Sequence, residues 1–464
     1  MRLAGYACLA VVITCCNPSS STALGSPPAP QGIQKIKHIV IVMQENRSFD
    51  SYFGTYPGAD GIPRDSSGQF SVCSPDPTTG SCIAPFHDPK NLDTDAPHAA
   101  AAARADIDGG KMDGFVAAAE AAKIPCNSNV DPNCSTGNRG DVMGYHDARE
   151  IPNYWRYAKD FVLQDHMFEP NASWSLPAHL FLVSEWSAAC ASGDPMSCTN
   201  ALDLPNRQDP VLPSHPAPNY AWTDLTYLLY RAQVSWKYYV EDGMQPDCTD
   251  GDLPCVPLTQ NPRTPEIWNP LPFFETVQQD GQVGNIQGLE SFYNDLATNQ
   301  LPAVSWIVPT WRQSEHAPGL LSDGQAHVTK VVNSIMQSAS WSSTAIFVSW
   351  DDWGGWYDHV VPPSVDQNGY GLRVPGLVIS PYARSGFIDH QTLSFDAYVK
   401  FIEYVFLGGQ RLDPANDGRP DPRPNVRENA SILGDLSRDF DFSQPPRPPE
   451  VLPLYPVFPK VSQE

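Results

Sequence analysis

Five short apolar runs along the chain have the continuity expected of buried β-strands. The first occupies residues 38–43, where hydrophobic positions follow one another instead of alternating with polar ones. Continuous hydrophobicity is typical of strands that are covered on both faces, as in parallel sheets. The other four predicted strands are Phe161–Gln164, Val304–Val308, Ala345–Trp350 and Val374–Ile379.

Amphipathic helical patterns lie between these strands. Apolar residues recur at the helical spacing i, i+3, i+4, i+7 within residues 289–296, 328–335 and 395–402. Strands that alternate with such helices predict an α/β fold with a central, mostly parallel sheet sandwiched by helices. Ligands of such sheets bind at the carboxyl ends of the strands. The polar residues that follow each strand are therefore the first candidates for chemistry.

Proline-rich segments mark the parts of the chain outside this pattern. The 464 residues include 47 prolines, about twice the usual share. We interpret residues 190–272, rich in Pro, Asp and Asn, as an insertion or lid around a short helical stretch near 222–240. Residues 410–464 are interpreted as a wrapping tail. The chain after residue 23 is expected to form a single domain, residues 24–464.

The N-terminus predicts export. Residues 1–23 combine one arginine, a short apolar run and small residues near Ala23, as in a cleaved secretory signal. A lipid anchor on Cys15 or Cys16 is the alternative. Neither this run nor any later segment reaches membrane-spanning length. We expect a secreted or periplasmic protein.

The cysteines agree with an oxidising compartment. Eight of the 11 follow the predicted signal and fall into four close pairs, each flanking a polar loop. Pairing by proximity predicts four local disulfides, whereas a metal cluster is disfavoured because no C-x-x-C spacing occurs. The pairs are Cys73/Cys82, Cys126/Cys134, Cys190/Cys198 and Cys248/Cys255.

The charge balance restricts the partners. With 29 Lys and Arg against 52 Asp and Glu, the formal net charge is −23. Nucleic-acid binding is disfavoured because phosphate contacts need clustered basic residues. Any site that handles phosphate in this chain needs a local positive charge, such as a bound metal ion.

Two pairs of oxygen-bearing side chains follow predicted strands. Glu45 and Asn46 come after the first strand, and Asp351 and Asp352 come after the strand that ends at Trp350. Carboxylate and amide oxygens suit a hard or borderline divalent cation, and adjacent carboxylates tolerate each other when a cation lies between them. The alternatives are a loop cap for the first pair and a solvated turn for the second.

Hydroxyl and imidazole groups complete the candidate chemistry. Ser173 and Ser175 precede an apolar helical stretch, where a hydroxyl is either a nucleophile or a plain helix cap. His98, His316 and His359 stand in polar surroundings. Each could be a ligand, a general acid or a phosphate donor, or have a structural role alone.

Several motifs together resemble the secreted bacterial phosphoesterase family of phospholipases C and acid phosphatases. The opening segment KHIVIVMQENRSFDSYFGTYPGADG and the late segment STAIFVSWDDWGGWYDHVVPP are the longest and most specific matches. The resemblance covers roughly residues 35–450. The other matching segments, in order, are GGKMDGF, SLPAHLFLVS, WIVPTWRQSEHAPG, VKFIEYVF and DFDFSQPPRPP.

The resemblance implies a fold and a metal site. Such enzymes resemble the alkaline phosphatase superfamily, in which a central sheet between helical layers carries the site at its strand ends. The metal-binding Glu-Asn and Asp-Asp of the family match Glu45, Asn46, Asp351 and Asp352. One divalent metal ion of unknown identity is therefore expected.

The resemblance also implies a nucleophile. The family uses a Ser or Thr two residues before a Pro-Asn-His or Pro-Asn-Arg segment, and Ser175 holds that position, with Ser173 as the fallback. Ala178 stands where the family has Asn, which puts one local hydrogen bond or substrate contact in question. The family histidines near the phosphate match His98 and His316.

These matches predict an exported, metal-dependent phosphoric ester hydrolase with a phosphoseryl intermediate. The substrate is a phosphate ester or a phospholipid, so phospholipase C and acid phosphatase activities both stay open. Proteins of another class, secreted binding proteins on an inactive phosphoesterase scaffold, are the alternative. A supporting role for His359 is left open.

Overall fold

A computed structural model gives the structure of most of the chain. It describes Met1 and residues 32–94, 96–122, 139–202, 219–245, 258–263, 267–317 and 319–456. Residues 2–23 of the predicted signal segment and the pairs Cys126/Cys134 and Cys248/Cys255 lie outside the described residues. Within the described part, no helix combines the length and the apolar character that a bilayer crossing requires.

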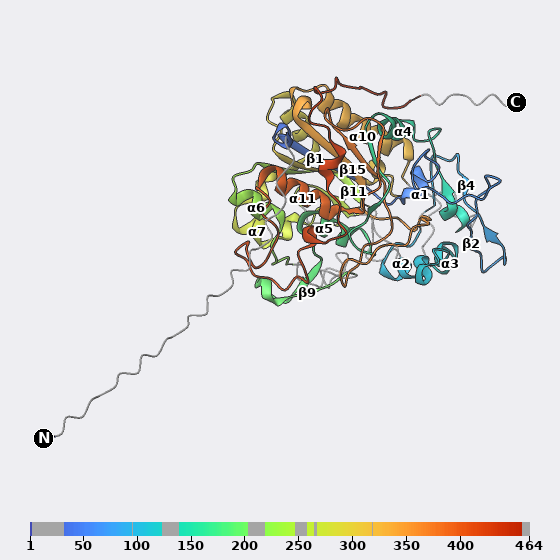
Figure 1. The fold of residues 1–464 in the computed structure, drawn as a ribbon, viewed down its shortest axis with the longest axis horizontal. Helices are drawn as coiled ribbons and strands as arrows, with labels where there is room; N and C mark the ends of the chain where they lie inside the picture. Colours follow the sequence, from blue (N-terminus) through green and yellow to red (C-terminus); the bar gives the residue numbers. More distant parts are fainter. Residues whose placement is uncertain are drawn as a thin grey trace.

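An eight-stranded sheet forms the centre of the molecule (Figure 1). Only β16 runs antiparallel to its two neighbours, while the other neighbouring strands of this sheet pair in parallel. The predicted α/β fold with a mostly parallel sheet is confirmed. In spatial order the strands are β13 (Ile286–Gly288), β10 (Trp236–Val240), β14 (Val304–Val308), β1 (His38–Gln44), β15 (Thr344–Trp350), β16 (Gly376–Ile379), β6 (Val162–Gln164) and β17 (Phe387–Asp389).

The helices surround this sheet. The three predicted amphipathic segments form α8 (Leu289–Ala297), α10 (Leu321–Met336) and α11 (Phe395–Phe406). Figure 1 shows α4 and α10 on one side of β1 and β15, and α5, α6 and α11 on the other. The remaining helices are α1 (Phe49–Phe53), α2 (Ala100–Ile107), α3 (Phe115–Ala121), α4 (Pro152–Asp160), α5 (Ser175–Ser184), α6 (Leu225–Arg231), α7 (Glu275–Gln279) and α9 (Trp311–Ser314).

The expectation of a helical stretch near residues 222–240 is correct only for its first half. Helix α6 covers Leu225–Arg231, and its N-cap Asp224 accepts a hydrogen bond from the Thr226 backbone N–H. The second half is β10, which pairs with β14 and β13. Its aromatic and β-branched side chains favour a strand. The described part of residues 190–272 thus contributes a strand to the central sheet.

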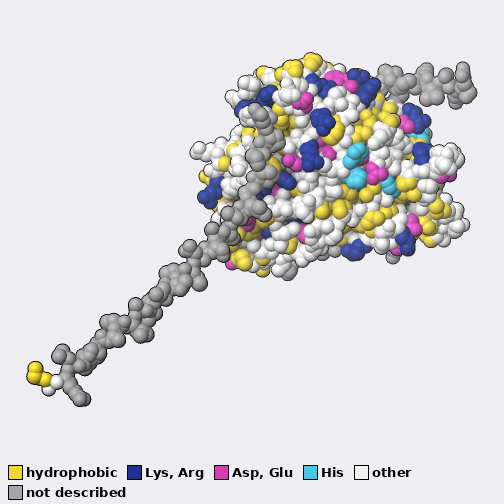
Figure 2. Space-filling model, viewed as in Figure 1, with side chains coloured by type: hydrophobic (Ala, Val, Ile, Leu, Met, Phe, Trp, Pro, Cys, Tyr) yellow, Lys and Arg dark blue, Asp and Glu magenta, His cyan; other side chains and the backbone are white. Residues whose placement is uncertain are grey.

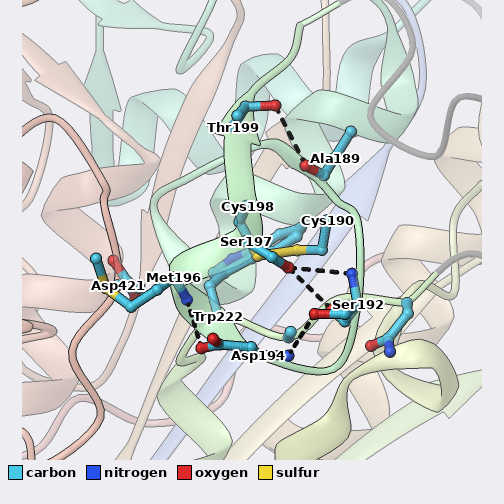
Figure 3. The surroundings of a disulfide bond; sticks show 12 residues. Ala189, Cys190, Ser192, Asp194, Met196, Ser197, Cys198, Thr199, Trp222 and Asp421 are labelled. Carbon is cyan, nitrogen blue, oxygen red and sulfur yellow. Dashed lines mark hydrogen bonds between the residues drawn. A yellow bond between two sulfur atoms is a disulfide. The ribbon is translucent and has the colours of Figure 1, made fainter.

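A disulfide joins the short strands β8 (Ala188–Cys190) and β9 (Cys198–Asn200), as Figure 3 shows. The polar loop between them is held by its own hydrogen bonds, such as that from the Met196 backbone N–H to the Asp194 carboxylate. Cys73 and Cys82 form a second disulfide across the antiparallel strands β2 (Ser74–Pro75) and β3 (Cys82–Ile83). Both bridges are among the four predicted local pairs.

A second, smaller hydrophobic core lies beside the main one. It is formed by residues of α2, α3 and their connecting segments, including Phe115 and Met143, and lies with β2 and β4 (Phe86–His87) at one end of the molecule in Figure 1. Trp353 and Tyr357, which follow Asp351 and Asp352 in the chain, also pack into this core. The segment after β15 therefore extends from the main core into the smaller one.

Residues 410–456 pack along the helices of this body. The carbonyl oxygens of Leu452 and Pro453 accept hydrogen bonds from Asn333 on α10 and Asn153 on α4. Arg427 is buried and pairs with Asp396 on α11. On the face shown in Figure 2, Lys and Arg side chains are scattered rather than gathered into one patch.

Candidate active site

The register of the central strands brings the two acidic motifs together. Gln44 at the end of β1 pairs with Trp350 at the end of β15. Glu45 and Asn46 therefore emerge beside Asp351 and Asp352 at the carboxyl edge of the sheet, and the Asn46 backbone N–H donates to Asp351 Oδ1 at 3.1 Å. All four side chains are buried.

The two glycines after Asp352 let the loop fold back over these residues. Gly354 has φ +63°, and a Cβ there would lie 2.7 Å from the Asn46 Cβ. A Cβ on Gly355, at φ +77°, would lie 2.6 Å from the Ala96 Cβ. The Gly354 backbone N–H donates to Asp352 Oδ1 at 2.7 Å. Neither position has room for a side chain, and the close approach fixes the Asp352 carboxylate.

Ser175 faces the carboxylates from the first turn of α5. Its Oγ lies 3.2 Å from Asp352 Oδ2 and 3.5 Å from Glu45 Oε2. The fallback residue Ser173 is turned elsewhere, because its hydroxyl donates to the Leu202 carbonyl oxygen at 3.0 Å. The structure thus brings Ser175, and not Ser173, into contact with the expected metal ligands.

The two candidate histidines lie together beside Asn46. His98 and His316 pack edge to face with ring centroids 5.6 Å apart. His98 Nδ1 lies 2.8 Å from the Ala96 carbonyl oxygen, which can only accept, so Nδ1 carries a proton. His98 Nε2 lies 3.2 Å from Asn46 Nδ2. The unprotonated Nε2 of His98 can therefore accept a hydrogen bond from the Asn46 amide and fix the orientation of that side chain.

His359 lies in a separate cluster of charged residues. Its Nδ1 is 2.7 Å from Asp50 Oδ2, and Arg373 bridges Asp50 and Asp358 at 3.0 Å each. Burial acts to lower the pKa of His359, but the neighbouring Asp50 carboxylate outweighs burial and the pKa is raised. These contacts give His359 a place in an ion-pair network rather than at Ser175.

Sequence reasoning missed His179, which lies one helical turn after Ser175. Its Nε2 is 3.3 Å from Glu45 Oε1 and 3.8 Å from Asp351 Oδ2, and all three side chains are buried. Its Nδ1 is 3.4 Å from the Tyr238 hydroxyl. The i, i+4 spacing from Ser175 places both residues on one helix face and was the signal that could have found it.

Glu315 is a second residue that the sequence did not reveal. It is buried with φ +72°, and its carboxylate accepts hydrogen bonds from the Tyr52 hydroxyl (2.7 Å), the Tyr154 hydroxyl (2.5 Å) and the Trp350 indole (3.0 Å). A Cβ on Gly324 would meet its side chain at 2.1 Å. Glu315 thus ties the segment that carries His316 to the end of β15.

Arg47 extends this network to the Glu-Asn motif. Its guanidinium donates to the Asn46 carbonyl oxygen at 2.9 Å, to the Tyr52 hydroxyl at 3.1 Å and to Asp93 Oδ2 at 3.1 Å. His146 holds the same Asp93 oxygen from its other side at 3.1 Å. The backbone at Asn46 is therefore fixed by a buried ion pair behind the site.

The donor set fits a divalent cation. The ligand atoms of Glu45, His179 and Asp351 all lie within 4.8 Å of one another. Asp351 Oδ2 and Asn46 Oδ1 are buried and accept no hydrogen bond from any residue in the described ranges. Several carboxylates converging in a buried site cost considerable free energy unless a positive charge compensates them. A cation among these oxygens would meet that need.

Comparison with known proteins agrees with the motifs. "Phospholipase C A" of Mycobacterium tuberculosis is 27% identical over an alignment of 505 residues that covers 100% of this chain and 88% of the relative. "Non-hemolytic phospholipase C" of Pseudomonas aeruginosa is 27% identical over 522 residues, which cover 100% of this chain and 65% of the relative.

Similar solved structures include a protein of the alkaline phosphatase superfamily from Vibrio parahaemolyticus and the phosphonate monoester hydrolase of Agrobacterium radiobacter. The first has 10% identity and a TM-score of 0.33, covering 57% of this chain and 62% of the other. The second has 11% identity and a TM-score of 0.32, covering 60% and 74%. The model of the Phosphoesterase family matches residues 36–407. The chain therefore belongs to the Phosphoesterase family and is a hydrolase of phosphoric esters.

Proposed function

We propose that this protein is an exported, metal-dependent hydrolase of phospholipase C type that uses Ser175 as its nucleophile. The observation that carries the proposal is the position of Ser175 Oγ, 3.2 Å from Asp352 and 3.5 Å from Glu45 at the start of α5. A hydroxyl between two carboxylates has an acceptor for its proton. The names of the phospholipase C relatives favour a phospholipid substrate over a simple monoester.

Glu45, Asn46, Asp351 and Asp352 are the residues that would hold the divalent cation. When bound, such a cation supplies Lewis acidity and the positive charge that the acidic chain lacks. Asn46 would offer Oδ1 to such a cation, because its Nδ2 donates to His98. The N-terminal end of α5 adds a favourable dipole for a phosphate group next to Ser175.

The chemistry at Ser175 would then run in two displacements. Ser175 Oγ gives its proton to Asp352 Oδ2 and bonds to phosphorus, while the bond from phosphorus to the leaving oxygen breaks. His316 Nε2 supplies the proton that the leaving alcohol takes up; its Nδ1 is held by the Ala317 carbonyl oxygen at 2.8 Å. Water then gives a proton to His316 Nε2 and bonds to phosphorus, while the bond from phosphorus to Ser175 Oγ breaks and Ser175 takes back its proton from Asp352.

Export is part of this proposal. The disulfides Cys73–Cys82 and Cys190–Cys198 are compatible with an oxidising compartment. The N-terminal segment supports the same interpretation by its composition. The chain would be released into the periplasm or the medium after cleavage near Ala23.

A two-substrate assay tests the activity. Metal-loaded protein is given p-nitrophenylphosphorylcholine and p-nitrophenyl phosphate in parallel, and we expect faster turnover of the diester. Ser175→Ala should lower turnover by about a thousandfold or more with the fold intact, whereas the matched variant Ser173→Ala should keep most activity. Near-normal turnover of Ser175→Ala would refute the nucleophile. Preference for the monoester would favour the acid phosphatase reading. Failure of the wild type on both substrates with every metal supplied would favour a binding protein.

A further inference from the structure

His179 presents a nitrogen to the metal site that the four predicted ligands do not include. We propose that His179 Nε2 is a metal ligand in this chain, which makes the site a mixed oxygen and nitrogen site that selects a zinc-like cation over Mg²⁺ or Ca²⁺. The proposal rests on the proposed function for the existence of the metal site. It adds the class of cation and the ligand that decides it.

Helix α5 supplies two residues to the two oxygens of one carboxylate. Ser175 Oγ approaches Glu45 Oε2 at 3.5 Å, and His179 Nε2 approaches Glu45 Oε1 at 3.3 Å. The same His179 nitrogen is 3.8 Å from Asp351 Oδ2. Ligands held about 2.0–2.2 Å from a tetrahedral zinc ion lie about 3.3–3.6 Å from one another. The spacing of these atoms is close to that of ligands around one ion.

The hydrogen bonds behind His179 direct Nε2 toward the site. The Tyr238 hydroxyl donates to the Trp268 carbonyl oxygen at 2.7 Å, so its lone pairs face His179 Nδ1 at 3.4 Å. A proton on Nδ1 satisfies this arrangement and places the Nε2 lone pair opposite Glu45 and Asp351. A lone pair facing two carboxylates is repulsive until a cation lies among them. A hydrogen-bonded second nitrogen is also the usual companion of a metal-bound histidine.

The donor atoms indicate the class of metal. Carboxylate and amide oxygens alone suit Mg²⁺, Ca²⁺ or Mn²⁺, whereas imidazole nitrogen favours Zn²⁺ and its neighbours in the first transition row. A histidine in a set otherwise made of Glu45, Asn46, Asp351 and Asp352 moves the preference toward the second group. The competing explanation is that His179 is a positive charge that pairs with the carboxylates and touches no metal.

The variants His179→Arg and His179→Gln separate these explanations. Arginine keeps a positive charge at this position, as in the Pro-Asn-Arg form of the family motif, but cannot ligate a metal in its protonated form. Glutamine keeps a polar side chain without imidazole. His327→Gln is the matched control, because His327 is a buried histidine on α10.

The measurements are metal affinity and the nature of the ligand atoms. Zn²⁺ and Mg²⁺ affinities are taken by isothermal titration of the metal-stripped protein, with circular dichroism to confirm folding. We expect both His179 variants to bind Zn²⁺ at least about tenfold more weakly and Mg²⁺ with little change, while His327→Gln matches wild type. Pulsed electron paramagnetic resonance of Cu²⁺-loaded protein should show ¹⁴N coupling in wild type and His98→Gln, and lose it in His179→Gln.

Two results would overturn the proposal. One is Zn²⁺ affinity that survives in His179→Arg, which would make His179 a charge partner. The other is ¹⁴N coupling that persists in His179→Gln or is missing from wild type. Both are independent of turnover, so they are distinguishable from failure of the proposed function, which shows as absence of hydrolysis in a protein that still binds its metal.

Discussion

Removing the charge of Glu315 should reduce turnover without displacing any predicted ligand. The Glu315 carboxylate accepts three buried hydrogen bonds, from Tyr52, Tyr154 and Trp350. Trp350, which donates one of these bonds, directly precedes Asp351 in the chain. Glu315 itself directly precedes His316. We expect Glu315→Gln to lower kcat about 10- to 100-fold with little change in KM, as for other residues that orient metal ligands.

The size of the stability change follows from the same three bonds. A hydrogen bond to a charged group contributes about 1.5–3 kcal/mol and a neutral one about 1 kcal/mol, so neutralising the acceptor of three bonds costs about 3 kcal/mol. Burying a neutral amide costs less desolvation free energy than burying a carboxylate, which offsets part of this loss. The expected net decrease in the free energy of unfolding is about 1–3 kcal/mol. Glu315→Ala would instead leave three buried donors without an acceptor, at about 3–9 kcal/mol, comparable to the stability of a whole domain. Glutamine is therefore the informative substitution.

The assay combines denaturant unfolding with steady-state kinetics on the metal-loaded protein. Glu290→Gln, at an exposed position on α8, is the matched control and should leave both measurements unchanged. Wild-type kcat in Glu315→Gln, together with the expected loss of stability, would refute the positioning role. Wild-type stability would refute the hydrogen-bond account itself.

Three further predictions concern the loop, the ion and the pH. Gly354→Ala should lower both the melting temperature and metal retention after dialysis, because a Cβ there meets Asn46 at a positive φ; full metal content would contradict this. Chelation should destabilise the protein reversibly, by about 4 kcal/mol when the ion had been present at a thousandfold excess over its Kd; an unchanged calorimetric transition would argue against a structural contribution of the ion. Burial and the neighbouring Glu428 raise the pKa of Glu185 well above 4.5. The stabilisation from the neutral carboxyl is fully present below the pKa of the unfolded state and is lost as the pH rises through the pKa of the folded state. Glu185→Gln should therefore reduce the fall of the melting temperature with pH above 4.5. An unaltered slope of melting temperature against pH would contradict this.

The sequence predicted five of the eight strands described in the sheet, because strands that are buried on both faces carry continuous apolar runs. The edge strands β13 and β17 and the neighbouring β10 were not predicted. β10 was missed because it lies in a polar, proline-rich region that we interpreted as an insertion, although its aromatic and β-branched side chains favour a strand. The direction of β16 was equally inaccessible, since the apolar pattern of a buried strand is the same in either direction. The positions of the buried strands along the chain could be predicted from their apolar runs, but the order and direction in which the strands pair could not.

The residues of the candidate site also differ in whether the sequence alone could predict them. Glu45 and Asp351 were predictable from their place after strands, and the β1–β15 register brings them together. The role of Glu315 could not be predicted, because its partners Tyr52 and Tyr154 are distant in the sequence and lie in no recognisable pattern with it. His179 lies within the segment SLPAHLFLVS, but its contacts with Glu45 and Asp351 depend on where α5 packs against the sheet.

The segment after β15 is anchored in two cores, and the proposed metal site therefore lies between them. Trp350 packs in the main core, whereas Trp353 and Tyr357 pack in the smaller one, so Asp351 and Asp352 lie where the two bodies meet. Ala96, which holds His98, belongs to the smaller core as well. Any loosening of the smaller core would therefore spread the ligands apart, so substitutions far from the metal would register first as loss of the ion and only later as loss of the fold.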